Sequence, residues 1–161
     1  MADKLVKAQV IAGCSIGQLT LTAAETIDVT GGCFVNIKTT TGTADHTVAA
    51  DTVISGYLDI GAQVDDANIA ANVLTVPASP GVKYTFDFYP VGVVVRMPVK
   101  TGQTVVAAMG GLLCDLDITT SKQTVDTGAT STEVVQILPV SAEDIASNTV
   151  RVIMNPAKVG R

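Results

Sequence analysis

The sequence lacks tryptophan, has few aromatic residues of any kind and carries little charge. Of its 161 residues only 4% are aromatic and 16% are charged, whereas 47% are hydrophobic and the mean hydropathy is +0.42. This composition excludes an intrinsically disordered chain, which combines low hydrophobicity with high net charge. It also excludes collagen-like and disulfide-dense scaffolds. The length fits one globular domain, or two small subdomains that share a core.

Basic residues are scarce as well, since ten Lys and Arg face fifteen Asp and Glu for a net charge of −5. They are scattered along the chain without interleaved aromatic residues, so nucleic acid is not an expected partner. The strongest apolar run, residues 91–95, is far too short to cross a membrane. The segment 11–14 resembles a lipoprotein signal, but the apolar stretch before it is too short for a signal peptide. Three cysteines without a CxxC pair predict reduced thiols, made in a cytoplasm.

Short alternating segments rich in β-branched residues fill the chain. In the clearest one Val82, Tyr84, Phe86 and Phe88 share one face, and polar residues occupy the other. Gly, Pro, Asn and Asp separate these segments, a pattern typical of a barrel or sandwich. We therefore predict an all-β fold, a compact β-barrel or sandwich of jelly-roll or β-tulip type, with little helix and extended terminal arms. The expected strands cover residues 4–11, 20–29, 33–38, 52–60, 73–76, 82–88, 91–99, 104–107, 112–116, 122–125, 133–138 and 149–154.

Helix is expected in only two places. Residues 65–72 have room for two turns, and Ser141-Ala142-Glu143-Asp144 is typical of a capped helix start. A compositional boundary falls near Pro77–Gly81 or Pro90. Placed at Pro90, it divides the chain into an N-terminal β-subdomain or arm, residues 1–90, and a C-terminal β-domain, residues 91–161. No internal repeat is apparent in the sequence.

The segment Val125-Asp126-Thr127-Gly128-Ala129 is the sharpest candidate for chemistry. It resembles the Asp-Thr-Gly-Ala motif of retroviral-type aspartic proteases, in which a homodimer brings two such aspartates together. The glycine-rich flap and closing segment of that family are not recognisable after Asp126. Because Asp-Thr-Gly also forms ordinary turns, we favour a turn, with a dimeric aspartic protease as an alternative.

The remaining polar candidates predict no site. His46 is the only histidine and is expected in an exposed loop, because no second His or Cys accompanies it as a metal ligand. Asp115 and Asp117 share a strand face and are expected to be solvated, since a hard cation needs more oxygen ligands. We therefore expect no catalytic residue, no metal and no cofactor, and a protein that is not an enzyme.

The C-terminal part carries a resemblance to a known family. After an apolar strand and a Thr-Gly-Gln turn come Val105-Val106-Ala107-Ala108-Met109-Gly110-Gly111-Leu112-Leu113, and the chain later reaches Val150-Arg151-Val152-Ile153-Met154. This stretch, less than half of the chain, resembles the head decoration (cement) proteins of tailed bacteriophages. The resemblance implies a virion protein on the capsid exterior that binds the major capsid protein. It also implies a homo-oligomer, with a trimer favoured, that stabilises the shell.

A decoration protein of this kind would use extended arms, which can add a strand to an exposed sheet edge. The residues expected to make such contacts are Lys4, Val6, Ala8 and Val10 near the start of the chain, and Pro156 and Val159 near its end. The apolar surplus is expected to be buried against copies of the chain or a larger shell. A small β-sandwich module that binds a glycan or a cell surface is a further alternative, although it would normally expose a Trp.

Overall fold

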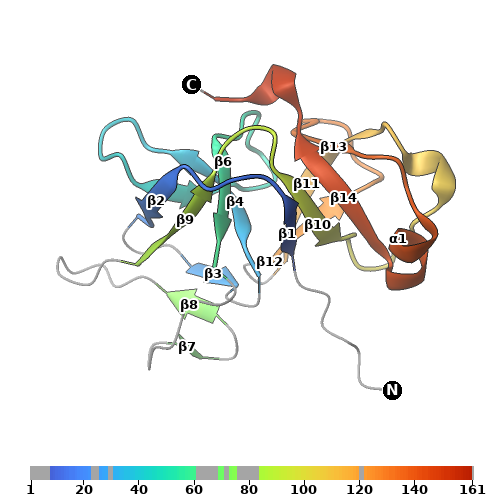
Figure 1. Cartoon of the computed structure of the whole chain (residues 1–161), viewed down its shortest axis with the longest axis horizontal. Helices are drawn as coiled ribbons and strands as arrows, with labels where there is room; N and C mark the ends of the chain where they lie inside the picture. Colours follow the sequence, from blue (N-terminus) through green and yellow to red (C-terminus); the bar gives the residue numbers. More distant parts are fainter. Residues whose placement is uncertain are drawn as a thin grey trace.

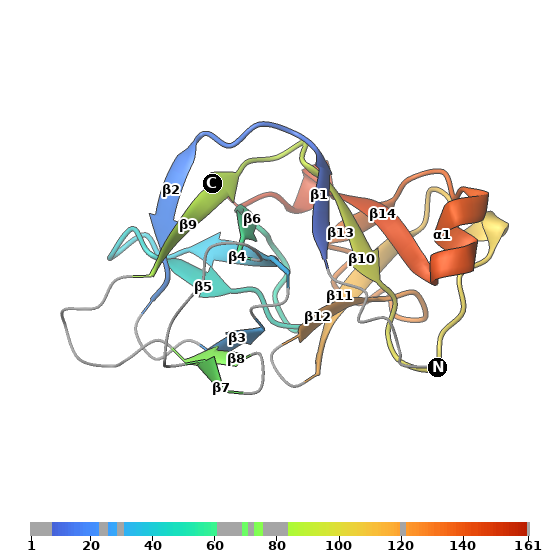
Figure 2. The same ribbon diagram turned by 60° about the horizontal axis from the view of Figure 1, so that its bottom comes forward.

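Two curled antiparallel sheets lie side by side along the long axis of the molecule in the computed structural model (Figure 1). A small three-stranded sheet lies below the first of them (Figures 1 and 2). The structure describes residues 8–22, 26–28, 31–60, 69–70, 73–75, 84–119 and 122–160. The all-β prediction is confirmed.

The strands are two to seven residues long, and each sheet is antiparallel throughout its ladders. The five-stranded sheet consists, in spatial order, of β2 (Gly17–Thr20), β9 (Thr85–Tyr89), β6 (Gly56–Asp59), β4 (Cys33–Ile37) and β5 (Ala44–His46). The six-stranded sheet consists of β1 (Gln9–Ala12), β10 (Val94–Pro98), β14 (Thr149–Met154), β13 (Val135–Ile137), β11 (Leu113–Thr119) and β12 (Lys122–Asp126). The small sheet consists of β3 (Thr26–Asp28), β8 (Val73–Thr75) and β7 (Ile69–Ala70). The helical elements are η1 (Ala107–Met109), α1 (Ala142–Ser147) and η2 (Pro156–Lys158).

The alternation in β9 has the predicted outcome. Tyr84, Phe86 and Phe88 are buried, whereas Thr85 is exposed. The helix start at Ser141 is also confirmed, because the Ser141 and Asp144 side chains form a reciprocal capping box at the N terminus of α1. Such local signals depend on neighbouring residues alone, which is why the sequence reveals them.

Three predicted elements are wrong. The expected strand over 20–29 is divided between β2 and β3, which belong to different sheets. The expected strand over 104–107 is irregular and leads into η1. Within the helix predicted over 65–72, Ile69–Ala70 forms strand β7, while residues 65–68 and 71–72 lie outside the described part. For β2 and β3, pairing with β9 and β8, which are distant in sequence, overrides the local pattern, whereas β7 pairs with its sequence neighbour β8.

Each curled sheet encloses its own buried cluster of apolar side chains. The cluster inside the five-stranded sheet contains Leu21, Ile27, Cys33, Val35, Ala44, Leu58, Ile60, Tyr84, Phe86 and Phe88. The cluster of the six-stranded sheet is larger, and its members include Val95, Met97, Val99, Cys114, Leu116, Val125, Ile137, Val152 and Met154. The three cysteines are free thiols; Cys14 is exposed, and Cys33 and Cys114 are buried.

The two curled sheets share apolar contacts at β4 and β6. Successive residues of a strand point to opposite faces, so Val35 enters the cluster of its own sheet while Phe34 enters the larger one. Tyr57 of β6 joins Phe34 there, with the two rings edge to face and their centroids 5.2 Å apart. The five-stranded sheet is therefore buried on both faces where it meets the six-stranded sheet.

A buried glutamine joins the same two sheets by hydrogen bonds. Gln123 of β12 is 3% exposed, and its amide oxygen accepts a hydrogen bond from the Phe34 N–H at 2.6 Å. Its amide nitrogen donates to the carbonyls of Phe34 (2.9 Å) and Thr47 (2.7 Å). The side chain thus supplies partners for the Phe34 N–H and the Thr47 carbonyl at the end of the β4–β5 ladder, and it adds a second donor to the Phe34 carbonyl, which also accepts from the Thr47 N–H.

The two sheets also share one topology, although the sequence shows no repeat. Numbered along the chain, the strands β2, β4, β5, β6 and β9 lie in the spatial order first, fifth, fourth, second, third. The strands β10, β11, β12, β13 and β14 lie in the same order. Each unit curls until its first and third strands meet in a single parallel bridge, Leu21 to Ala44 in one and Val99 to Val125 in the other. The chain therefore contains two topologically equivalent units, which we call unit 1 (β2–β9) and unit 2 (β10–β14).

The additions to the two units occupy equivalent connections. Between the first and second strands, unit 1 inserts β3 and unit 2 inserts η1. Between the fourth and fifth strands, unit 1 inserts β7 and β8, and unit 2 inserts α1. The predicted boundary near Pro90 lies between β9 and β10, while β1 from the N-terminal part pairs with unit 2.

Replacing Gln123 tests the hydrogen-bonded link between the units. The substitution Gln123→Leu keeps an apolar stem but takes away the hydrogen-bond partner of the Phe34 N–H and of the Thr47 carbonyl, so we expect a loss of about 2–4 kcal/mol in unfolding free energy. Urea denaturation followed by circular dichroism measures it. Gln136→Leu is the matched control, because the Gln136 amide makes only a 3.5 Å contact with the Gly111 carbonyl; an equal loss in both variants would contradict the proposed role of Gln123.

Candidate interaction surface

The residues predicted to form terminal arms lie partly against the chain's own core. Val10 in β1 and Val159 near the C terminus are half-buried against the larger apolar cluster. Ala8 packs there too and approaches Gly31 so closely that a Cβ on Gly31 would lie 2.8 Å from the Ala8 carbonyl oxygen. Pro156 is exposed at the start of η2. Lys4 and Val6 lie outside the described residues.

The C-terminal segment joins the first half of the chain to the second. The Ile54 N–H donates to the Lys158 carbonyl, and the Gly160 N–H donates to the Ile54 carbonyl, both at 2.9 Å. Val159 and Ile54 form a parallel bridge at this point. These bonds hold residues 158–160 against Ile54 of the same chain, whereas Pro156 and Ala157 of η2 stay exposed.

The Asp126 carboxylate is held by groups of its own chain. It accepts hydrogen bonds from Lys100 Nζ and Gln103 Nε2, each at 2.7 Å, and from the Gly128 N–H at 3.0 Å. The ammonium of Lys100 holds the pKa of this carboxyl below its usual range. A protease dyad requires one of two facing carboxyls to keep a proton, and the Lys100 contact opposes protonation. This geometry supports the turn interpretation of the Asp126–Ala129 segment.

His46 is neither exposed nor in a loop, which corrects the expectation from the sequence. It lies in β5, pairs with Val35 across the ladder and is 8% exposed. The Thr-rich surroundings conceal this strand, because it is only three residues long and gains its stability from β4.

Asp115 is likewise not a solvated acid. It is 6% exposed, and its carboxylate accepts backbone hydrogen bonds from Ser131, Thr132 and Glu133 at 2.7–2.9 Å. Burial alone would raise its pKa, but these three donors outweigh it and lower the pKa. Asp117 instead forms an ion pair with Lys100 at 3.2 Å. Within the described ranges no three His, Cys, Asp or Glu residues gather as a metal site.

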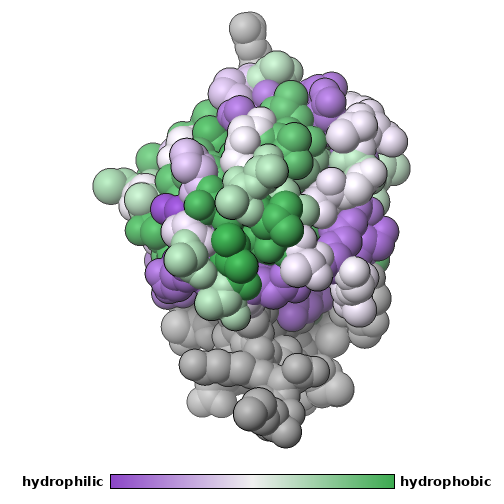
Figure 3. Space-filling view, turned by 90° about the vertical axis from the view of Figure 1, so that its right-hand side faces the viewer, coloured by the Kyte–Doolittle hydropathy of each residue, from purple (hydrophilic) through white to green (hydrophobic). Residues whose placement is uncertain are grey.

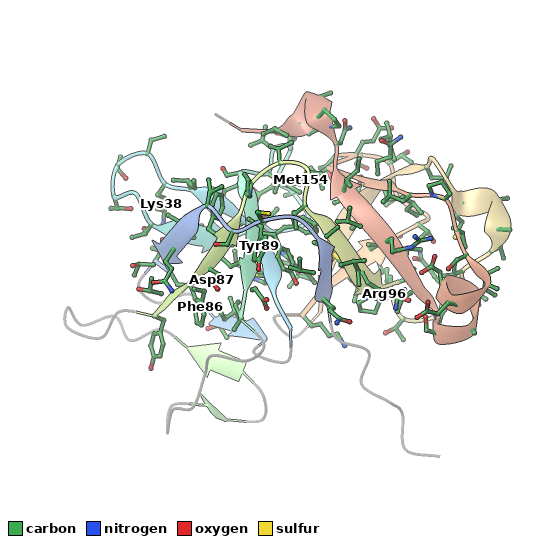
Figure 4. The ribbon with its side chains drawn as sticks, viewed as in Figure 1. Lys38, Phe86, Asp87, Tyr89, Arg96 and Met154 are labelled. Carbon is green, nitrogen blue, oxygen red and sulfur yellow. The ribbon has the colours of Figure 1, made fainter. Side chains whose placement is uncertain are left out.

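A charged network supports α1 against β10 and β14. Asp144, buried at the first turn of α1, accepts hydrogen bonds from the Ser141 N–H at 2.8 Å and from Arg151 of β14 at 3.0–3.1 Å. Arg96 of β10, which lies beside α1 in Figure 4, pairs with Glu143 at 2.8 Å and with Asp144 at 3.7 Å. Burial acts to raise the Asp144 pKa, but the Ser141 and Arg151 donors outweigh it and lower the pKa. Because β10 and β14 belong to the rigid sheet, the network fixes the position of α1.

Beside this network, η1 and α1 form an exposed apolar surface. Val106, Leu112 and Ile145 are 48%, 43% and 42% exposed, which is unusual for large aliphatic side chains on one end of a small domain. Figure 3 shows hydrophobic atoms gathered in the middle of this end, with hydrophilic atoms around them. We call it the end face, and its exposed apolar residues are Val106, Ala107, Ala108, Leu112, Ala142, Ile145 and Ala146.

The end face coincides with the segment that carries the resemblance to decoration proteins, since Val105–Leu113 contains η1. Local sequence alone does not reveal the end face. Residues 104–107 have a strand-like pattern, and Ile145 lies over thirty positions after Leu112. Comparison with protein-family models, curated proteins and solved structures found no match for this chain. Among the described residues, no helix is long and apolar enough to span a membrane.

The pH dependence of stability tests the Asp144 network. The folded-state pKa of Asp144 is lowered and its unfolded pKa is ordinary, near 4, so the network stabilises fully above that value and less as the pH falls through it. Asp144→Asn should lower the unfolding free energy by about 2–4 kcal/mol at pH 7, and the deficit relative to wild type should shrink by pH 3. Urea denaturation at both pH values measures this.

The control is Glu143→Gln, which removes a largely exposed partner of Arg96 and should change stability by no more than about 0.5 kcal/mol. A deficit of Asp144→Asn that stays constant between pH 7 and pH 3 would show that the carboxylate charge does not stabilise the fold.

Proposed function

We propose that this protein is a non-catalytic structural protein that assembles into a homo-oligomer through its end face and stabilises the exterior of a bacteriophage capsid. The observation that carries the proposal is the cluster of exposed aliphatic side chains on η1 and α1 (Figure 3). The Val105–Leu113 segment, which resembles decoration proteins, supplies half of that surface.

The end face suits contact with copies of the same chain. Its centre has Val, Leu, Ile and Ala side chains without formal charge, so two copies meet there without charge repulsion despite a net charge of −5 on each chain. Alanine side chains and the Gly110-Gly111 turn permit close approach of backbones. Identical subunits form such contacts symmetrically, and symmetric assemblies bind a symmetric shell at many points.

The neighbouring charges support a rigid rather than a reactive surface. Arg96, Arg151, Glu143 and Asp144 neutralise one another at the rim, and each has a partner within α1, β10 or β14. The carboxylates that sequence suggested for chemistry, Asp126 and Asp115, are engaged by groups of their own chain. A rigid apolar face held by an internal charge network is an arrangement suited to assembly.

Charge placed on the end face should break the oligomer. We expect Val106→Glu and Leu112→Glu, singly, to raise the dissociation constant of self-association at least about tenfold, because each buries a carboxylate in an apolar contact. Sedimentation velocity over a concentration series measures this, with circular dichroism to confirm folding. Val48→Glu is the matched control, since Val48 is equally exposed (46%) but lies away from this face. A wild-type protein that stays monomeric throughout would refute assembly through the end face.

Binding to a shell is a separate prediction. Purified protein should co-sediment with expanded capsids of a tailed phage whose genome encodes it, and raise the temperature at which they disrupt. Leu112→Glu should bind such capsids more weakly, because fewer subunits act together. If wild-type protein stays in the supernatant at every concentration, the decoration role is wrong even if the protein oligomerises.

A further inference from the structure

The two topologically equivalent units differ at one edge. In unit 2, the outer edge of the first strand, β10, is covered by an additional antiparallel strand, β1. Gln9, Val10 and Ala12 pair there with Arg96, Val95 and Val94. In unit 1, the first strand is β2, and within the described ranges no strand pairs with its outer edge. Figure 2 shows β2 at the outer limit of its sheet.

The uncovered part of β2 corresponds in position to the part of β10 that β1 covers. The parallel bridges that close the units involve Val99 at the end of β10 and Leu21 just after β2. β1 pairs with residues three to five positions before Val99, and the equivalent residues before Leu21 are 16–18. An apolar groove of about 250 Å³ lies at this place, lined by Ile16, Gly17, Gln18, Leu19, Ile37 and Phe88.

The backbone of β2 presents hydrogen-bonding groups along this groove. Leu21 donates to the Tyr84 carbonyl, so the alternation of an antiparallel ladder turns the N–H and C=O groups of Leu19 toward β9. The same groups of Gln18 and Thr20 turn away from β9. Beyond Thr20 this edge is closed by β5, because Leu21 and Ala44 form the parallel bridge and the Thr22 N–H donates to the Ala44 carbonyl. The open part of the edge therefore consists of the Gln18 N–H and C=O groups and the Thr20 N–H, and within the described ranges no strand ladder includes them on that side.

The residues around the outer edge of β2 favour pairing with an uncharged extended strand. Residues 8–22 contain no charged residue and no proline, the two devices by which proteins commonly protect a strand edge. The nearest carboxylate, Asp87 on β9, accepts a hydrogen bond from Gln18 at 3.2 Å (Figure 4 labels Asp87). Ile16 at the mouth of the groove is 68% exposed, the largest exposure among the large hydrophobic residues of the described part.

We propose that β2 pairs antiparallel with β2 of a second copy of this chain, so that two unit 1 sheets join edge to edge. The second copy presents the same uncharged segment, with the same outward groups at Gln18 and Thr20, and a two-fold axis satisfies both edges in one closed contact. β1 on β10 is the precedent within the molecule, because it shows that the equivalent edge takes an uncharged antiparallel strand. This interface is distinct from the end face and does not depend on the proposed function.

The test removes one outward N–H and keeps the backbone hydrogen bonds to β9. Thr20→Pro deletes the donor at the edge, which is a position where strands tolerate proline. Thr20→Val is the matched control, since it keeps the N–H and loses only the Thr20–Thr85 hydroxyl contact. Both changes are made in the Leu112→Glu protein, so that association through the end face does not obscure the result. Sedimentation equilibrium measures the dimer, and circular dichroism confirms folding.

We expect the Leu112→Glu protein and its Thr20→Val derivative to form dimers with equal dissociation constants. Thr20→Pro should raise that constant at least about tenfold, because the edge hydrogen bonds are lost. Ile16→Lys replaces an exposed side chain and should also raise the dissociation constant, because it places two like charges at the contact. The proposal is overturned if the Leu112→Glu protein is monomeric, or if both Thr20→Pro and Ile16→Lys leave its dimer unchanged. If the wild-type protein oligomerises while the Leu112→Glu protein is monomeric, the end face stands and only the β2 contact is refuted.

Discussion

The three hydrogen bonds of the Gln123 amide hold the two halves of this protein in one arrangement. The amide binds the Phe34 N–H and the Thr47 carbonyl at the end of the β4–β5 ladder, and it does so from the sheet of the other unit. Apolar contact between Phe34, Tyr57 and the larger cluster is non-directional and permits small rotations. A buried amide with both ends bonded allows only one position, because any displacement leaves polar groups unpaired.

The two units share one strand order, but their equivalent connections carry different insertions. The first and fourth connections of unit 1 build the small sheet of β3, β7 and β8, whereas those of unit 2 build η1 and α1. The Asp144 network anchors α1 to β10 and β14, and Asn148, the C-cap of α1, bonds the Gln103 carbonyl and the Val105 N–H just before η1, so that α1 and η1 lie at the same end. The end face is therefore a property of two insertions held on a rigid sheet.

Secondary structure was predictable where one segment decides it. The alternation of Tyr84, Phe86 and Phe88 and the capping box at Ser141 depend on spacing along the chain, and both are confirmed. The exposed state expected for His46 and Asp115 was wrong, because β4 covers one and the 131–133 backbone surrounds the other. Short strands such as β5 carry too few residues for a pattern, so their partners determine them.

The sequence by itself determined the all-β class, the position of α1 and the surplus of aliphatic residues, because propensity, spacing and composition are local quantities. Only the tertiary structure decided that the chain holds two units of one topology, since equivalent strand order leaves no mark when the two sets of side chains differ. It also decided where the surplus lies: Val10 and Val159 pack on the core, while Val106, Leu112 and Ile145 stay exposed together. Residues distant in the chain become one surface only when the sheets that carry them curl and pack, because long-range pairing sets their positions.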